Sequence, residues 1–113
     1  TLALIREVAL RHNIPFMLIL LAMPHGPYRD PSEAEMSWQA LQALAYGARG
    51  IAYFAYWTPV NVMYQDVMKF RHGLIENGAR TDHYFQAMRL NQVVLAVARC
   101  LTQSCCCPGS PRA

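Results

Sequence analysis

The segment from Ile51 to Trp57 constrains the fold more than any other. It reads Ile-Ala-Tyr-Phe-Ala-Tyr-Trp, so an extended strand would be apolar on both faces. Gly47 ends the helical pattern that precedes it, and Thr58-Pro59 follows it. Strands that are apolar on both faces are typical of parallel sheets covered by helices. The sequence therefore predicts an α/β fold, with Trp57 at the carboxyl end of a strand, where such folds place their active sites.

The rest of the chain alternates helical and extended patterns. Periodicity predicts helices at 2–11, from Ser32 to about Gly47, and from Thr81 or Asp82 to about residue 99, with another strand at 16–22. Ser32 and Glu35 have the spacing of a capping box, and Asp30 as the cap with Pro31 at the first helical position is a rival start for the same helix. Residues 76–78 form a turn signal. Alternation with short connections predicts parallel strands.

The helix that starts at Ser32 carries an apolar series with spacings of four and three residues. We expect this series to be the buried stripe and Trp38 to lie in the core. Its members are Ala34, Trp38, Leu41, Ala45 and Ala48.

Two parallel strands leave both sheet edges without a neighbour. The element order suits the last two or so βα units of a (β/α)₈ TIM barrel, which takes about 250 residues in full. We therefore expect residues 1–100 to be a carboxyl-terminal barrel fragment that needs the remainder of the barrel for a complete fold. The first residue is Thr1 and not methionine, directly before an expected helix, so we expect a fragment whose amino-terminal part is missing. Residues 101–113 break the pattern, and we expect a disordered or out-of-frame tail.

Composition argues against several other classes of protein. A hydrophobic share of 54% and a charged share of 15% favour a buried interior over a disordered chain. The basic residues are scattered, so we expect no nucleic-acid partner. The longest apolar run, 14–23, is half the length of a bilayer span, so we expect no membrane span. Three of the four cysteines are adjacent, which is a poor spacing for zinc, and we expect neither metal nor cofactor.

Four stretches together resemble a known family. They are residues 28–39 (YRDPSEAEMSWQ), 44–51 (LAYGARGI), 53–59 (YFAYWTP) and 74–85 (LIENGARTDHYF). The chain is similar to the closing part of the TIM barrel of bacterial clan A glycoside hydrolases, most of all to a beta-galactosidase-like branch. This resemblance covers about residues 1–100.

The resemblance implies a carbohydrate-active protein that acts on O-glycosidic bonds of an oligosaccharide or glycoside. In that family an acid/base usually follows the fourth barrel strand and a nucleophile the seventh. The apparent seventh strand ends Leu21-Ala22-Met23-Pro24-His25-Gly26, without an acid at its tip. We therefore assign no catalytic residue here and leave open whether this chain is an enzyme. The resemblance makes a secreted or periplasmic location plausible, but the sequence does not fix the location.

Trp57 is the first candidate for substrate binding. An indole face can stack on a sugar ring while its N–H still finds a partner, and the resemblance implies a subsite next to the scissile bond. His25 and Tyr28 lie in the loop after the first strand, and Thr58 follows Trp57, so we include all three as substrate-binding residues. The nearby acids Glu33 and Glu35 are better explained as helix-start residues than as catalysts.

Two other functions stay open. A non-catalytic carbohydrate-binding barrel would keep the aromatic platform without the nucleophile. A barrel enzyme unrelated to sugars would use Trp57 for packing. An acid at the end of the fourth strand, upstream of these residues, would favour the hydrolase.

Overall fold

The computed structural model describes residues 1–104, with side-chain surroundings for 1–100. Along the chain the elements are α1 (Leu2–His12), β1 (Met17–Leu21), α2 (Glu33–Ala45), β2 (Gly50–Phe54), α3 (Gln65–Met68), β3 (Ile75–Glu76), β4 (Ala79–Arg80) and α4 (Asp82–Ser104). The last helix therefore extends beyond its predicted end and into the expected tail, of which 105–113 lie outside the described residues.

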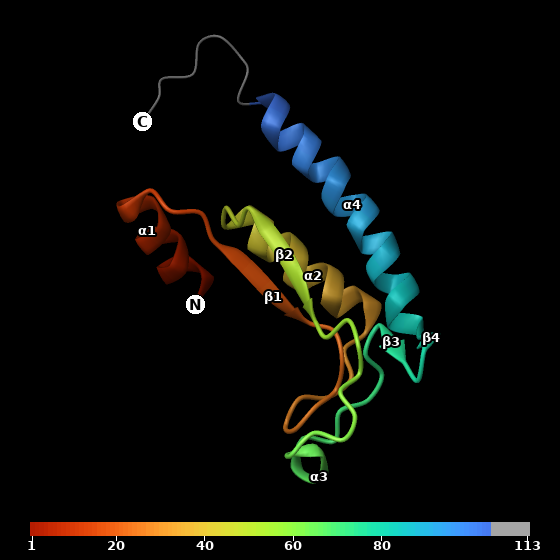
Figure 1. Ribbon diagram of the computed structural model, residues 1–113. Helices are drawn as coiled ribbons and strands as arrows, with labels where there is room; N and C mark the ends of the chain where they lie inside the picture. Colours follow the sequence, from red (N-terminus) through yellow and green to blue (C-terminus); the bar gives the residue numbers. More distant parts are fainter. Residues whose placement is uncertain (105–113) are drawn as a thin grey trace.

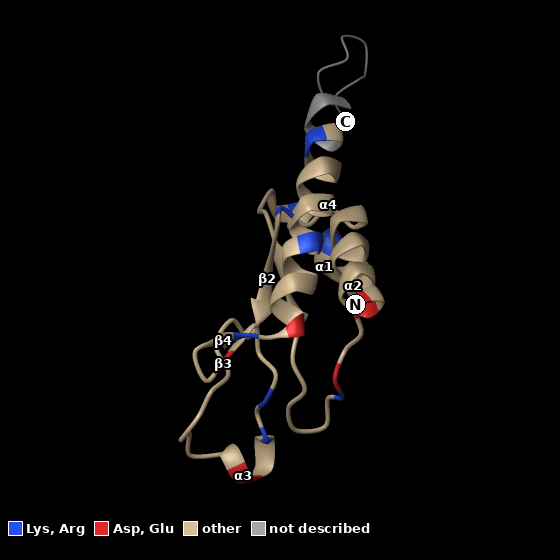
Figure 2. Cartoon of the chain, turned by 90° about the vertical axis from the view of Figure 1, so that its right-hand side faces the viewer, with Lys and Arg blue, Asp and Glu red and all other residues tan. Residues whose placement is uncertain are grey.

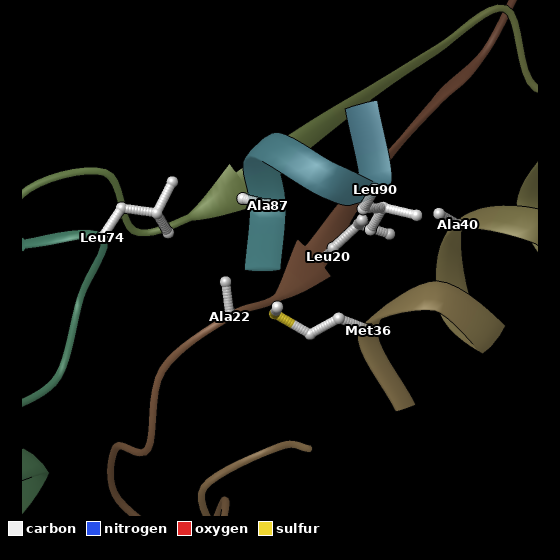
Figure 3. Packing of buried hydrophobic residues seen from close by; sticks show 7 residues of the cluster. All are labelled: Leu20, Ala22, Met36, Ala40, Leu74, Ala87 and Leu90. Atoms are coloured by element: carbon white, nitrogen blue, oxygen red, sulfur yellow. The ribbon is translucent and has the colours of Figure 1, made fainter. Parts of the chain in front are cut away.

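The strands β1 and β2 are parallel, as predicted, in a register that pairs Met17 with Gly50 and Leu21 with Phe54. The helices α2 and α4 lie together on one side of this pair (Figure 1). The hydrophobic core forms between these layers (Figure 3). Its buried members are Leu20, Ala22, Met36, Ala40, Leu74, Ala87 and Leu90.

The opposite face of β1 is open. Met17 is 59% exposed and Ile19 is 65% exposed, whereas Leu20 between them is 0% exposed. The described residues therefore cover only one face of this strand. The physical reason is that α2 and α4 both pack on the Leu20 side, and no element within residues 1–104 covers the other side.

Local signals in the sequence fix both ends of α2. The Ser32 hydroxyl accepts the Glu35 N–H at 3.3 Å while a Glu35 carboxylate oxygen accepts the Ser32 N–H at 2.9 Å, which confirms the capping box. At the other end Gly47 has φ 94°, and the Ala48 N–H donates to the Ala43 carbonyl at 2.9 Å. This is a Schellman motif, and it confirms Gly47 as the left-handed terminator.

The predicted buried stripe is wrong within α2, and of its members only Ala48, which lies beyond the end of this helix, is buried. Trp38 is 66% exposed, and the residues with no exposed surface are Met36, Ala40 and Ala43. Gln39 sets this orientation, because its amide accepts the Leu21 N–H at 2.9 Å and donates to the Leu21 carbonyl at 3.2 Å. These two bonds tie α2 to the end of β1 and satisfy Leu21 on the sheet edge away from β2.

The strand β2 ends at Phe54, earlier than the sequence predicts. The chain then turns to pair with the segment before β3. The carbonyls of Ala55 and Tyr56 accept the N–H groups of Leu74 and Ile75 at 3.1 Å and 2.7 Å. Trp57 therefore lies opposite Ile75 in an isolated parallel bridge, outside β2. The predicted turn before β4 is confirmed by a hairpin between β3 and β4 with left-handed residues at 77 and 78.

The helix α1 is loosely attached to the rest of the chain. No residue of α1 is buried, and its Arg6 guanidinium donates to the Tyr46 carbonyl at 3.1 Å. The Lys and Arg positions are distributed over several elements of the described chain (Figure 2). Within the described part of the chain, no helix combines the length and hydropathy needed to cross a lipid bilayer.

Candidate functional site

The loop after β1 is anchored before it reaches the surface. Met23 is 0% exposed and Pro24 is also fully buried, so His25 emerges from a fixed base. The His25 and Tyr28 backbones exchange N–H···O bonds of 3.1 Å and 2.9 Å, which closes the loop into a tight turn. Gly26, at φ 50°, donates its N–H to the Met68 carbonyl at 2.6 Å and so joins this loop to the end of α3.

His25 lies at the centre of a group of rings, which we name the aromatic cluster (His25, Tyr28, Phe54 and Phe70). The His25 ring centroid is 4.8 Å from that of Phe54, 5.1 Å from that of Tyr28 and 5.7 Å from that of Phe70. Phe54 is the last residue of β2, so the aromatic cluster lies at the carboxyl end of the parallel pair. Figure 1 shows the connecting loops and α3 gathered at this end.

The aromatic cluster presents surface to solvent. Tyr28 is 56% exposed, Phe54 is 38% exposed and His25 is half-buried. The His25 Nδ1 lies 3.1 Å from the Met23 carbonyl, which can only accept, so this nitrogen donates. The neutral ring then keeps Nε2 as an acceptor, and Nε2 has no protein partner within residues 1–100.

Trp57 lies at the same end of the sheet but outside the aromatic cluster. Its side chain is 52% exposed, and within the described residues its ring makes no ring-to-ring contact. Phe54 and Phe70, which sequence reasoning missed, contact His25 instead. Phe54 closes the observed strand, so a correct strand end would have pointed to it. Phe70 lies in a segment without periodicity and carries no such signal.

Thr58 is buried and does not lie at the surface. It is 2% exposed, its hydroxyl donates to the Ile75 carbonyl at 3.1 Å, and it accepts the Gly73 N–H at 2.9 Å. This buried position differs from the surface position that substrate binding by Thr58 would need. Its hydroxyl holds the segment before β3 against the end of the sheet.

The acids near the site are held in ion pairs. Glu33 accepts two hydrogen bonds from Arg89 of α4, at 2.7 Å and 2.9 Å, and this pair lowers the pKa of the carboxyl group. The hydrogen bonds from Arg29 and Ser32 lower the pKa of Glu35 to about 2. A general acid has to keep its proton near neutral pH, so neither group suits that role. This agrees with their assignment to the helix start.

Asp30 joins three segments through two histidines, and we name this group the Asp30 clamp (Asp30, His72 and His83). One carboxylate oxygen lies 2.6 Å from His83 Nε2 and the other lies 3.2 Å from His72 Nδ1. His83, in the first turn of α4, is 7% exposed and also contacts the Gln86 amide oxygen at 2.7 Å. The clamp connects the loop after β1 to the segment before β3 and to α4. Its members are 42 and 53 positions apart, so sequence reasoning missed it.

The clamp makes stability depend on pH. Partial burial raises the pKa of Asp30, but the hydrogen bonds from His83 and His72 outweigh burial and hold this pKa below its ordinary value of 3.8. A lowered folded-state pKa stabilises the fold above the ordinary value, and this stabilisation is lost as pH falls through the lowered pKa. We expect Asp30→Asn to lower the melting temperature near neutral pH and to lose this effect as the pH falls through the lowered pKa.

Melting curves across this pH range test the expectation. The control is Asp66→Asn, which removes an exposed carboxylate on α3. A melting-temperature difference for Asp30→Asn that stays constant from neutral to acid pH would show that the carboxylate charge does not stabilise the fold.

No protein-family model, curated protein or solved structure matches this chain. The geometry of the site therefore carries its interpretation. It combines partly exposed aromatic rings, one free imidazole nitrogen and a nearby exposed indole at the carboxyl end of two parallel strands. Such a surface can stack against a flat ligand face and form hydrogen bonds at its edge.

Proposed function

We propose that this chain is part of a carbohydrate-active (β/α)₈ barrel, and that it supplies the aromatic sugar-binding end of the last barrel strand. One observation carries the proposal. The aromatic cluster assembles around His25 at the carboxyl end of a parallel strand pair, where barrel proteins bind their substrates.

The chemistry of the site suits a sugar ring. A pyranose has an apolar C–H face and a rim of hydroxyl groups. Tyr28 and Trp57 offer exposed ring faces for the first, and His25 Nε2 offers an acceptor for the second. Because the sequence resembles that of beta-galactosidase-like hydrolases, a β-galactoside is the first sugar to test.

The open surfaces of the chain favour the proposal that it belongs to a larger barrel. Within residues 1–104 the pair β1–β2 has two edges without a neighbouring strand, and the face that carries Met17 and Ile19 is exposed. The Cα radius of gyration is 16.8 Å, whereas about 13 Å is expected for a compact domain of this length. Further βα units would cover the open face and continue the sheet.

A second candidate is a non-catalytic carbohydrate-binding barrel. It is favoured by the ion pairs of Asp30, Glu33 and Glu35, which leave none of these three acids poised to give up or take a proton. Both candidates assign sugar binding to this chain. They differ in whether catalytic carboxylates come from the rest of the barrel.

The two tryptophans of the chain allow a direct test. In a Trp38→Phe variant Trp57 is the only tryptophan, and it is half exposed. We expect methyl β-D-galactopyranoside to change its fluorescence saturably, because stacking replaces water at the indole face. Adding His25→Ala should weaken the apparent affinity by up to about tenfold, the effect of losing one hydrogen bond of ~1.5 kcal/mol.

Mannitol is the matched control, because it offers similar hydroxyl groups without a ring face. An equal response to mannitol, or no saturable response to the galactoside, would overturn the proposal. Cleavage of an aryl β-galactoside by the chain, abolished by Glu33→Gln or Glu35→Gln, would overturn the assignment of binding without catalytic acids.

A further inference from the structure

A hollow of about 490 Å³ shares Tyr28 with the aromatic cluster. We name it the Trp38 groove (Leu21, Pro27, Tyr28, Arg29, Glu35 and Trp38). Its volume falls in the range of small-molecule sites. It lies where β1 ends and α2 begins, so it is built from the two segments that flank the loop carrying His25.

Two exposed aromatic side chains line the groove. Trp38 is 66% exposed and Tyr28 is 56% exposed. In the part of the chain that the structure describes, neither the Trp38 indole N–H nor the Tyr28 hydroxyl has a hydrogen-bond partner. Trp38 is not a member of the hydrophobic core, so its exposed ring and its free donor are available to a bound molecule.

The charged groups of the groove favour a neutral ligand. Arg29 and Glu35 form a two-point pair, in which Arg29 Nη1 donates to Glu35 Oε2 at 3.0 Å and Nη2 donates to Oε1. Glu35 Oε2 also accepts from the Ser32 N–H and hydroxyl. The two charges therefore offset each other, and an ion of either sign gains little. The Arg29 Nε–H and one Nη2–H remain free to donate to hydroxyl groups.

Tyr28 connects the groove to the proposed sugar site, since its ring contacts His25 and also lines the groove. We propose that the Trp38 groove is an outer saccharide subsite, which binds one sugar unit of an oligosaccharide while a neighbouring unit lies at the aromatic cluster. This inference rests on the proposed function. It adds a prediction about ligand length, because only a ligand of several units can reach both places.

Single-tryptophan variants distinguish binding at the Trp38 groove from binding at the aromatic cluster. In a Trp57→Phe variant Trp38 is the only tryptophan. We expect its fluorescence to respond to a β-1,4-linked galactotetraose at concentrations at which methyl β-D-galactopyranoside has no effect. The reference for the next comparison is the Trp38→Phe variant, in which Trp57 reports alone. Relative to it, Trp38→Ala should weaken tetrasaccharide binding by up to about tenfold and leave monosaccharide binding unchanged. Trp38→Tyr should restore much of the loss.

Leu41→Ala is the matched control, because Leu41 is exposed on the same helix and lies outside the groove. If Trp57 responds to both sugars while Trp38 responds to neither, the outer subsite is wrong and the proposed function stands. Equal weakening of both sugars by Trp38→Ala also overturns the subsite. If neither tryptophan responds to either sugar, the proposed function fails and the subsite fails with it.

Discussion

Replacing Leu20 by Ala is expected to lower the free energy of unfolding by about 2–5 kcal/mol. Leu20 has no exposed surface and packs between α2 and α4 in the core. The substitution removes buried methyl groups and leaves a cavity that the backbone of β1 cannot close. Small domains are stable by only about 5–15 kcal/mol, so this loss is a large share. Urea unfolding followed by circular dichroism measures it.

Ile19→Ala is the matched control, because it removes a similar side chain from the next position on the opposite face. Ile19 is 65% exposed, so we expect a change within about 0.5 kcal/mol. Leu20→Met keeps the volume and should cost less than about 1.5 kcal/mol, which preserves the comparison if the alanine variant does not fold. Equal losses for the Leu20 and Ile19 alanine variants would mean that both faces of β1 are covered in solution.

Local sequence signals predicted the two ends of α2 and the turn between β3 and β4. The capping box at Ser32 and the Schellman motif at Gly47 each depend on residues within a few positions of one another. The hairpin after Glu76 depends in the same way on a two-residue turn. Such features satisfy backbone groups locally, so the sequence contains all the information that they need.

The orientation of α2 could not be predicted in this way. The expected stripe through Trp38 and the observed stripe through Met36 and Ala40 have the same helical spacing. What separates them is the double hydrogen bond between Gln39 and Leu21 and the packing of α4. Both involve residues that are distant in sequence, and a single-helix pattern does not contain them.

The positions of the candidate site residues were predicted in part, for a related reason. Strand position predicted that His25, Tyr28 and Trp57 lie at the carboxyl end of the sheet, and all three lie there. Strand alternation failed after Phe54, because the chain leaves β2 and pairs with the segment before β3. That departure takes Thr58 inside and brings Phe70 to His25.

Gly73 holds this returning segment in place, and we expect Gly73→Ala to cost about 1–3 kcal/mol of unfolding free energy. A Cβ atom at Gly73 would lie 2.8 Å from Thr58 Oγ1, 3.0 Å from Thr58 N and 3.1 Å from the Ala55 carbonyl oxygen. Two of these atoms belong to the backbone, so no side-chain rotation can relieve the contact. The substitution should also disturb the Gly73 N–H bond to Thr58 and displace nearby Phe70 from His25.

Gly50→Ala is the matched control for this substitution. A Cβ atom at Gly50 would lie 3.6 Å from the nearest Met17 atoms, which is an ordinary van der Waals distance, and neither glycine has a positive φ. We therefore expect Gly50→Ala to change stability by less than about 0.5 kcal/mol. Sugar binding gives a second measurement, because displacement of Phe70 should weaken the response of Trp57 to the galactoside in the Gly73 variant alone. Equal stability and equal binding in the two variants would show that the close approach of Gly73 to Thr58 does not support the aromatic cluster.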